Sequence, residues 1–134
     1  MKIEFLDNIS DGGKFTGVIA DQLIRLFDFD TLQANKLRQK IQEIIIEKGE
    51  RLDLSKLEFI ETINCNLVLS ISDVDTGILI NNENNFICEI TTDGYKNMVD
   101  LLEPFCIKDS SNIYQWLYEI DTPIEFLFSS KGTW

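Results

Sequence analysis

The sequence predicts an α+β fold: a mostly antiparallel sheet of about 5–7 strands, with one long helix and two shorter helices packed on one face. Three observations lead to this prediction. Apolar residues recur at helical spacing between residues 31 and 48, apolar and polar residues alternate in most segments after residue 56, and short turns join those segments. Because a parallel crossover needs about a dozen residues or more, short turns favour antiparallel pairing.

The chain is long enough to form one hydrophobic core. Its 134 residues are 44% hydrophobic, and a chain of this length buries somewhat under about 70% of its unfolded surface without metals or disulfides. We therefore expect a single domain, residues 1–134. The opening residues 1–7 include acids and no apolar run, and no stretch reaches the roughly 18 apolar residues of a membrane span. We expect neither a signal peptide nor a membrane anchor.

Two strands separated by a loop are expected before the first helix. Alternation in Lys2–Asp7 predicts a short strand. Asn8–Gly17 contains three glycines and is the most obvious loop of the chain. Gln22–Phe29 is rich in β-forming residues and predicts a second strand, which ends at Asp30.

The long helix has sequence signals at both ends, over residues 31–48. Asp30 and Gln33 form a capping box, in which the carboxylate accepts a first-turn N–H and the glutamine side chain returns to the N-cap residue. Gly49 supplies the C-terminal stop. The apolar face between these signals consists of Leu37, Ile41, Ile44 and Ile45.

Strands dominate the second half of the chain. Residues 57–63 and 65–72 predict two strands, and residues 78–80 and 86–90 predict two more. Because the connections between these strands are short, we expect an antiparallel meander. Alternation over residues 124–128 predicts the last strand.

Two further helices are expected between these strands. The second helix begins at Thr91 or Thr92 and runs toward Pro104, which is expected to end it. A short third helix is capped by Ser110 or Ser111. The apolar faces of the two helices are Tyr95, Met98, Val99 and Leu102 in the second and Ile113, Trp116 and Leu117 in the third.

The amino-acid composition excludes several classes of function. The chain has no histidine, so it cannot form a Ser-His-Asp or Cys-His site, a His-ligated zinc site or a proximal-histidine haem site. Cys65, Cys88 and Cys106 are an odd number of widely spaced cysteines, which fits reduced thiols and a cytoplasmic location. Cys65 and Cys88 lie on the apolar phase of their strands, so we expect core packing rather than reactivity.

Two segments resemble ligand-binding motifs but fail in detail. Asp73–Gly77, followed by Glu83, is similar to the opening of a calcium loop, yet an oxygen ligand is required where Gly77 stands and a glycine where Ile78 stands. We expect a hairpin turn there and no metal. The Gly13–Lys14 pair lacks the spacing of a phosphate-binding loop. No cofactor is expected.

Charge is distributed unevenly along the chain. Residues 1–56 hold nine basic and ten acidic side chains, a net charge of −1, whereas residues 57–134 hold three basic and thirteen acidic ones, a net charge of −10. Nucleic acid is not expected as a partner, because phosphate binding needs a basic stripe and acids interrupt the basic residues of the long helix. The basic residues on and after that helix are Lys36, Arg38, Lys40, Lys48, Arg51 and Lys56.

These observations predict a non-enzymatic protein-binding module whose acidic C-terminal half engages a basic partner. Its size and charge are those of bacterial immunity proteins and antitoxin-like inhibitors, which is an analogy without a motif. Acidity that serves solubility alone is the plain alternative. The residues expected to bind the partner are Asp73, Asp75, Glu83, Glu89, Asp93 and Trp134.

Two other functions stay open. One is a small enzyme, or a domain that binds a ligand or divalent cation, which uses carboxylates and has the Asn8–Gly17 loop and the Asp73–Gly77 turn at the edges of its site. The other is a homodimer formed through an exposed sheet edge or through Ile44–Ile46, because this isoleucine run is broader than one buried helix face requires.

Overall fold

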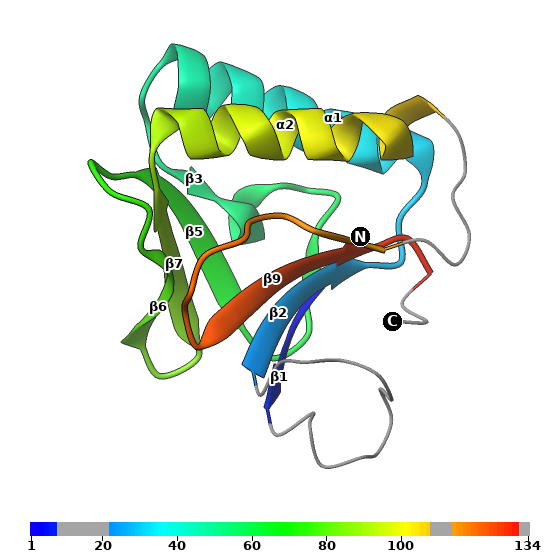
Figure 1. Ribbon diagram of the computed structural model, residues 1–134. Helices are drawn as coiled ribbons and strands as arrows, with labels where there is room; N and C mark the ends of the chain where they lie inside the picture. Colours follow the sequence, from blue (N-terminus) through cyan, green and yellow to red (C-terminus); the bar gives the residue numbers. More distant parts are fainter. Residues whose placement is uncertain (8–21, 108–113, 132–134) are drawn as a thin grey trace.

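The computed structural model describes residues 1–7, 22–107 and 114–131, which form two β-sheets beneath a pair of helices (Figure 1). The strands are β1 (Lys2–Asp7), β2 (Gln22–Phe27), β3 (Leu52–Asp53), β4 (Glu61–Thr62), β5 (Asn66–Ile71), β6 (Gly77–Asn82), β7 (Asn85–Ile90), β8 (Tyr114–Trp116) and β9 (Ile124–Ser129). The helical segments are α1 (Thr31–Lys40), its π-helical continuation η1 (Ile41–Glu47), the 3-10 turn η2 (Leu54–Lys56) and α2 (Thr92–Ile107).

Both sheets are mixed, so the α+β class is confirmed but the mostly antiparallel sheet is wrong. The first sheet has the order β4-β1-β2-β9-β8, with β1 parallel to β4 and β2 parallel to β9. The second has the order β3-β5-β7-β6, with β5 parallel to β7. The neighbouring pairs β1–β2, β8–β9, β3–β5 and β6–β7 are antiparallel.

The predicted meander fails at β7. The hairpin of β6 and β7 forms as expected, but β7 lies between β5 and β6 and pairs with both. A parallel pair arises here without a helical crossover, because β6 itself carries the chain back to the end where β5 began. The Asp73–Gly77 segment therefore connects β5 to an outer strand, and it is not a hairpin turn between paired strands.

The strand predicted over residues 57–63 is also wrong for most of its length. The Leu57 N–H donates to the Leu54 carbonyl at 3.2 Å, and the Ile60 N–H donates to the Leu57 carbonyl at 3.0 Å. These local hydrogen bonds form turns. The N–H and carbonyl groups that they engage are then not available for pairing with a neighbouring strand. Pairing starts only at β4, beside β1.

The third predicted helix is wrong from Tyr114 onward, where β8 pairs with β9; residues 110–113 lie outside the described part of the chain. The second predicted helix is confirmed as α2, although it continues past Pro104 to Ile107. Phe105 supports this last turn, because its ring packs edge-on against Phe128 with the centroids 4.9 Å apart. No helix in the three described ranges is long and apolar enough to cross a membrane.

The first helix and its capping box are confirmed. The Asp30 carboxylate accepts the Gln33 N–H at 2.8 Å, and the Gln33 side chain accepts the Asp30 N–H at 3.3 Å. The helix widens into π turns from Ile41 and ends before Gly49, whose φ is 68°. Within these turns Ile45 is buried, and Ile44 and Ile46 pack against the core while staying half-buried. Dimerisation itself stays a prediction.

One hydrophobic core lies between the helix pair and the two sheets. Phe29, Phe105 and Phe128 form an aromatic cluster that joins α2 to the first sheet, and the Phe29 and Phe128 rings stack with centroids 4.1 Å apart. Phe5 of β1 and Phe86 of β7 meet at 4.8 Å, so the two sheets also contact each other directly. This packing fixes where α2 lies relative to both sheets.

Tyr95 attaches α2 to the second sheet. Its side chain is fully buried, and its hydroxyl lies 2.8 Å from the carbonyl oxygen of Ser70 on β5 and 3.0 Å from that of Cys88 on β7. The hydroxyl has one proton to donate, which the two carbonyls share. Burial raises the pKa of this hydroxyl, so the proton stays in place at any physiological pH.

We predict that Tyr95→Phe lowers the free energy of unfolding by about 1–2 kcal/mol, because two buried carbonyl oxygens lose their donor while the packing of the ring is kept. Urea unfolding followed by circular dichroism measures this loss. An unfolding free energy equal to that of the wild type would contradict the role assigned to the hydroxyl.

Candidate functional site

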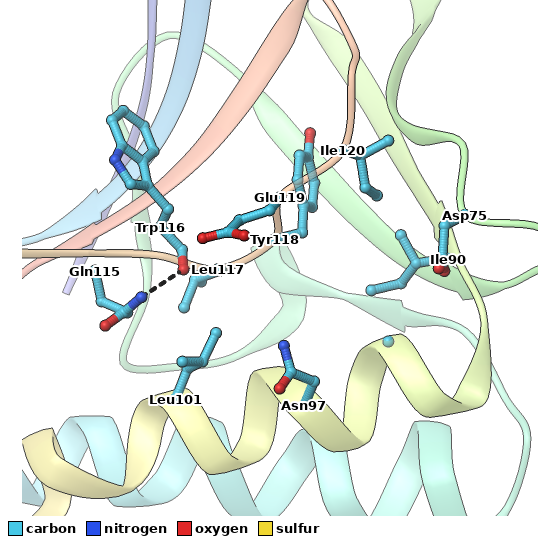
Figure 2. Close-up of a pocket in the computed structure, with 11 residues that line it drawn as sticks. Asp75, Ile90, Asn97, Leu101, Gln115, Trp116, Leu117, Tyr118, Glu119 and Ile120 are labelled. Atoms are coloured by element: carbon cyan, nitrogen blue, oxygen red, sulfur yellow. Dashed lines mark hydrogen bonds between the residues drawn. The ribbon is translucent and has the colours of Figure 1, made fainter. Parts of the chain in front are cut away.

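A groove lies between α2 and residues 115–120, which comprise the end of β8 and the first part of the segment that connects it to β9 (Figure 2). Its volume is about 300 Å³. One wall comes from α2 and the other from the connecting segment, and Asp75 and Ile90 stand at one end. The lining residues are Asp75, Ile90, Gly94, Asn97, Leu101, Gln115, Trp116, Leu117, Tyr118, Glu119 and Ile120.

The wall from α2 follows from the spacing of its residues. Gly94, Asn97 and Leu101 recur at intervals of three and four, so they lie on one face of the helix. Tyr95 and Met98, their neighbours in sequence, point into the core and are fully buried. Figure 2 shows Asn97 and Leu101 rising from α2 toward the connecting segment.

The opposite wall is held in place by Tyr118. Its buried hydroxyl accepts the Ile78 N–H of β6 at 3.2 Å and donates to the Ile124 carbonyl of β9. The Leu117 N–H donates to the Phe126 carbonyl at 2.8 Å. These bonds fix the segment across the front of α2, so that Glu119 and Ile120 are presented at the groove.

Carboxylates dominate the charge of the groove. Two lining residues, Asp75 and Glu119, are acidic, and none of the lining residues is basic. The Glu119 side chain is exposed and runs back along the segment toward Trp116 (Figure 2). Leu101 and Ile120 add apolar surface to the groove, whereas the Trp116 indole points away from α2 (Figure 2).

More acids surround this end of the molecule. Burial, and after it the charge of Asp121, raises the pKa of Glu125. The pKa of the Cys88 thiol is raised to about 12 by burial, with smaller effects of the Asp75 and Glu89 charges in the same direction. Asp75 of the β5–β6 connection and Glu89 of β7 thus act on the same buried thiol, and Asp121 of the β8–β9 connection acts on Glu125 of β9.

The structure brings together four of the six residues predicted from the sequence. Because β5 and β7 are parallel, the segments that follow them start from the same end of the strands. These four residues lie at that end. Glu83 lies in the turn at the other end of the β6–β7 hairpin, and Trp134 lies outside the described residues. The four residues are Asp73, Asp75, Glu89 and Asp93.

Asp75 has a structural role in addition to lining the groove. One carboxylate oxygen accepts both the backbone N–H and the hydroxyl of Thr91, at 2.8 and 2.9 Å. The Thr91 hydroxyl oxygen in turn accepts the Gly94 N–H at 3.1 Å, which caps α2. Within the described ranges, no group of three or more histidine, cysteine or acidic side chains is arranged to hold a metal ion.

Asp75 is the one residue of the groove lining that was predicted from the sequence as a binding residue. The polar lining residues that sequence reasoning missed include Asn97, Gln115 and Glu119. Asn97 and Glu119 stand out only as polar residues among apolar neighbours, a pattern that any solvated surface shares. Gln115 was also expected within the short third helix, whereas it lies in β8. The signal that was present is the excess of acids after residue 56, to which Glu119 belongs.

Comparison of the chain with protein-family models, with curated proteins and with solved structures finds no match in any of the three. The geometry and charge of the groove are therefore the basis on which a function can be proposed.

We predict that Asp75→Ala lowers the free energy of unfolding by about 1–2 kcal/mol, because the Thr91 N–H and hydroxyl lose their acceptor at the start of α2. Thermal unfolding and hydrogen exchange at the first turn of α2 measure the effect. Asp73→Ala is the matched control: it removes an exposed carboxylate two residues away and should change stability by less than about 0.5 kcal/mol. Equal losses in both variants would contradict the assignment.

The buried thiols predict how stability depends on pH. Burial raises the pKa of Cys65 and of Cys88 from 9.0 to about 12, so between these pH values the unfolded chain loses protons that the folded protein keeps. Below pH 9 these two thiols are protonated in both the folded and the unfolded chain, so they do not change the free energy of unfolding. As pH rises from 9 toward 12, the free energy of unfolding should fall. Urea unfolding at a series of pH values measures this slope, which Cys88→Ala should reduce. A flat or rising profile would be inconsistent with buried thiols.

Proposed function

We propose that the groove between α2 and residues 115–120 binds a basic segment of a partner protein, so that the chain serves as a protein-binding module. The observation that carries the proposal is the lining of the groove: the Glu119 carboxylate shares it with the apolar side chains of Leu101 and Ile120, Asp75 stands at one end, and no lining residue is basic.

This combination fits the chemistry of lysine and arginine side chains. Both have an apolar stem that packs on hydrophobic surface and a charged head that is best placed against a carboxylate. In the groove, Leu101 and Ile120 would contact the stem and Glu119 would receive the head.

The acids around the groove support the same class of partner. Asp93, Asp121 and Glu125 lie at this end of the molecule and add negative potential to that of the groove itself. Clustered charge of one sign raises association rates with partners of the opposite sign and disfavours other partners. Association should therefore weaken as ionic strength rises.

The size of the groove favours side chains of a protein over a small-molecule ligand. Its volume of about 300 Å³ lies at the lower limit for sites that enclose small molecules, which extend to about 1,000 Å³. One or two side chains of a partner fill such a space, while the surface around it supplies the rest of the interface.

Binding of a model peptide tests the proposal. A fluorescein-labelled peptide of alternating arginine and leucine should bind the wild-type chain at low salt, measured by fluorescence anisotropy. Glu119→Gln should raise the Kd about threefold to tenfold, because it removes one carboxylate and keeps the shape of the side chain. Glu83→Gln is the control, since it makes the same change of charge at the distant end of the hairpin.

Two results would overturn the proposal. One is that the wild-type chain fails to bind the arginine–leucine peptide at low salt. The other is that Glu83→Gln weakens binding as much as Glu119→Gln, which would indicate a general effect of net charge. With the peptide result in hand, a tagged chain and its Glu119→Lys variant can be compared as baits in cell lysate; the basic partner should be recovered by the wild type alone and released by salt.

A further inference from the structure

Two adjoining cavities form a second groove on α1 and the segment that follows η1. One cavity, of about 370 Å³, lies between α1 and residues 56–59, and the other, of about 470 Å³, lies between η1, β3 and β5. They share Lys56 and Leu57, so they adjoin at these two residues, and we call the pair the basic groove. None of its lining residues belongs to the groove between α2 and residues 115–120, which we call the acidic groove.

Four cationic side chains line the basic groove in a row. Lys36 and Lys40 are one helical turn apart on α1, Lys56 stands where the two cavities meet, and Arg51 lines the far cavity. None of the four forms an ion pair with an acid in the described residues. By contrast, Lys2, Arg25 and Arg38 pair with Asp28, Glu4 and Glu103.

Apolar side chains lie between these cations. Ile44, Leu57 and Val68 line the groove and are half-buried, as is Phe59. The Lys36 ammonium lies 5.9 Å from the centroid of the Phe59 ring. The groove therefore combines a row of positive charge with a mainly aliphatic surface.

The two acids in the basic groove do not cancel its charge. The Asp53 carboxylate accepts hydrogen bonds from Ser55 and Asn66 at 2.7 to 3.0 Å. Burial raises the pKa of Asp53, but these hydrogen bonds outweigh burial and hold the pKa below its usual value. These hydrogen bonds keep Asp53 ionised, as does the nearby charge of Lys56, so Asp53 and exposed Glu58 each carry a negative charge. The four cations and these two carboxylates still leave the basic groove with a net charge of +2.

We propose that the basic groove binds an acidic segment of a protein in which apolar residues alternate with carboxylates. A row of separate cations along two cavities fits an extended chain of negative charges better than one compact anion. The net charge of −11 does not prevent this, because salt screens distant charges over about 8 Å at physiological ionic strength, while the four cations act at contact distance.

Single-stranded nucleic acid fits the basic groove less well than an acidic peptide. Nonspecific binding of single strands uses aromatic rings on which successive bases stack. Phe59 is the one aromatic residue among the residues that line the two cavities, and the remaining apolar ones are aliphatic. Leucine, isoleucine or valine side chains of a peptide match that surface.

Three probes test this inference by fluorescence anisotropy: a fluorescein-labelled peptide of alternating glutamate and leucine, the arginine–leucine peptide used above, and a short oligo-dT. The wild-type chain should bind the glutamate–leucine peptide. Lys56→Glu should raise the Kd for it about tenfold or more, because one cation is replaced by a repelling charge where the cavities meet. The double variant Lys36→Glu/Lys40→Glu should do the same from the α1 side.

Lys96→Glu is the matched control, because Lys96 is an exposed lysine of α2 outside the basic groove and the change of net charge is identical. It should change the Kd less than about twofold. Lys56→Glu should still bind the arginine–leucine peptide, and Glu119→Gln should still bind the glutamate–leucine peptide, so failure at one groove is distinguished from failure at the other. Absence of glutamate–leucine binding at millimolar concentration, equal loss in Lys96→Glu, or tighter binding of oligo-dT would overturn the inference.

Discussion

The hydroxyl of Tyr118 is the contact on which the arrangement of the two sheets and the acidic groove depends. It accepts the Ile78 N–H from β6 of the second sheet and donates to the Ile124 carbonyl of β9 in the first. The same joint is tightly packed at Gly77, where an added Cβ would lie 3.0 Å from Thr122. Because Tyr118 belongs to the segment that forms one wall of the groove, the contact that joins the sheets also positions Glu119.

Local sequence signals predicted the elements whose bonds are local. The capping box at Asp30, the helix that follows it and the β6–β7 hairpin each depend on residues a few positions apart, and all three are present. The parallel pairing of β5 with β7 joins residues about twenty positions apart and leaves no mark in either strand. The stripe of Ile113, Trp116 and Leu117 suggested a helix, yet Tyr114–Trp116 pairs with β9, a partner that local periodicity does not reveal.

The candidate site was predictable in its charge and unpredictable in its shape. Counting acids after residue 56 was enough to expect a negative surface, and four of the six predicted residues do lie near one edge of the second sheet. The groove itself needs Asn97 from α2 opposite Glu119 from the β8–β9 connection, a juxtaposition that exists only after both sheets have formed. The basic residues of α1 were expected to be a solvated face, because acids interrupt them along the helix. The sequence does not reveal that the turn at η2 brings Lys56 to the same cavity as Lys36 and Lys40.

The central position of β7 has a consequence for the order of folding. β7 lies between β5 and β6, which both precede it in the chain. Its pairing with β6 is a local hairpin that can form early, whereas its parallel pairing with β5 needs the chain to reverse direction twice. Docking of that hairpin on β5 must follow, and with it the closure of a longer loop. Assembly of the second sheet is therefore expected to proceed from its outer strand inward, with the parallel seam as its late step.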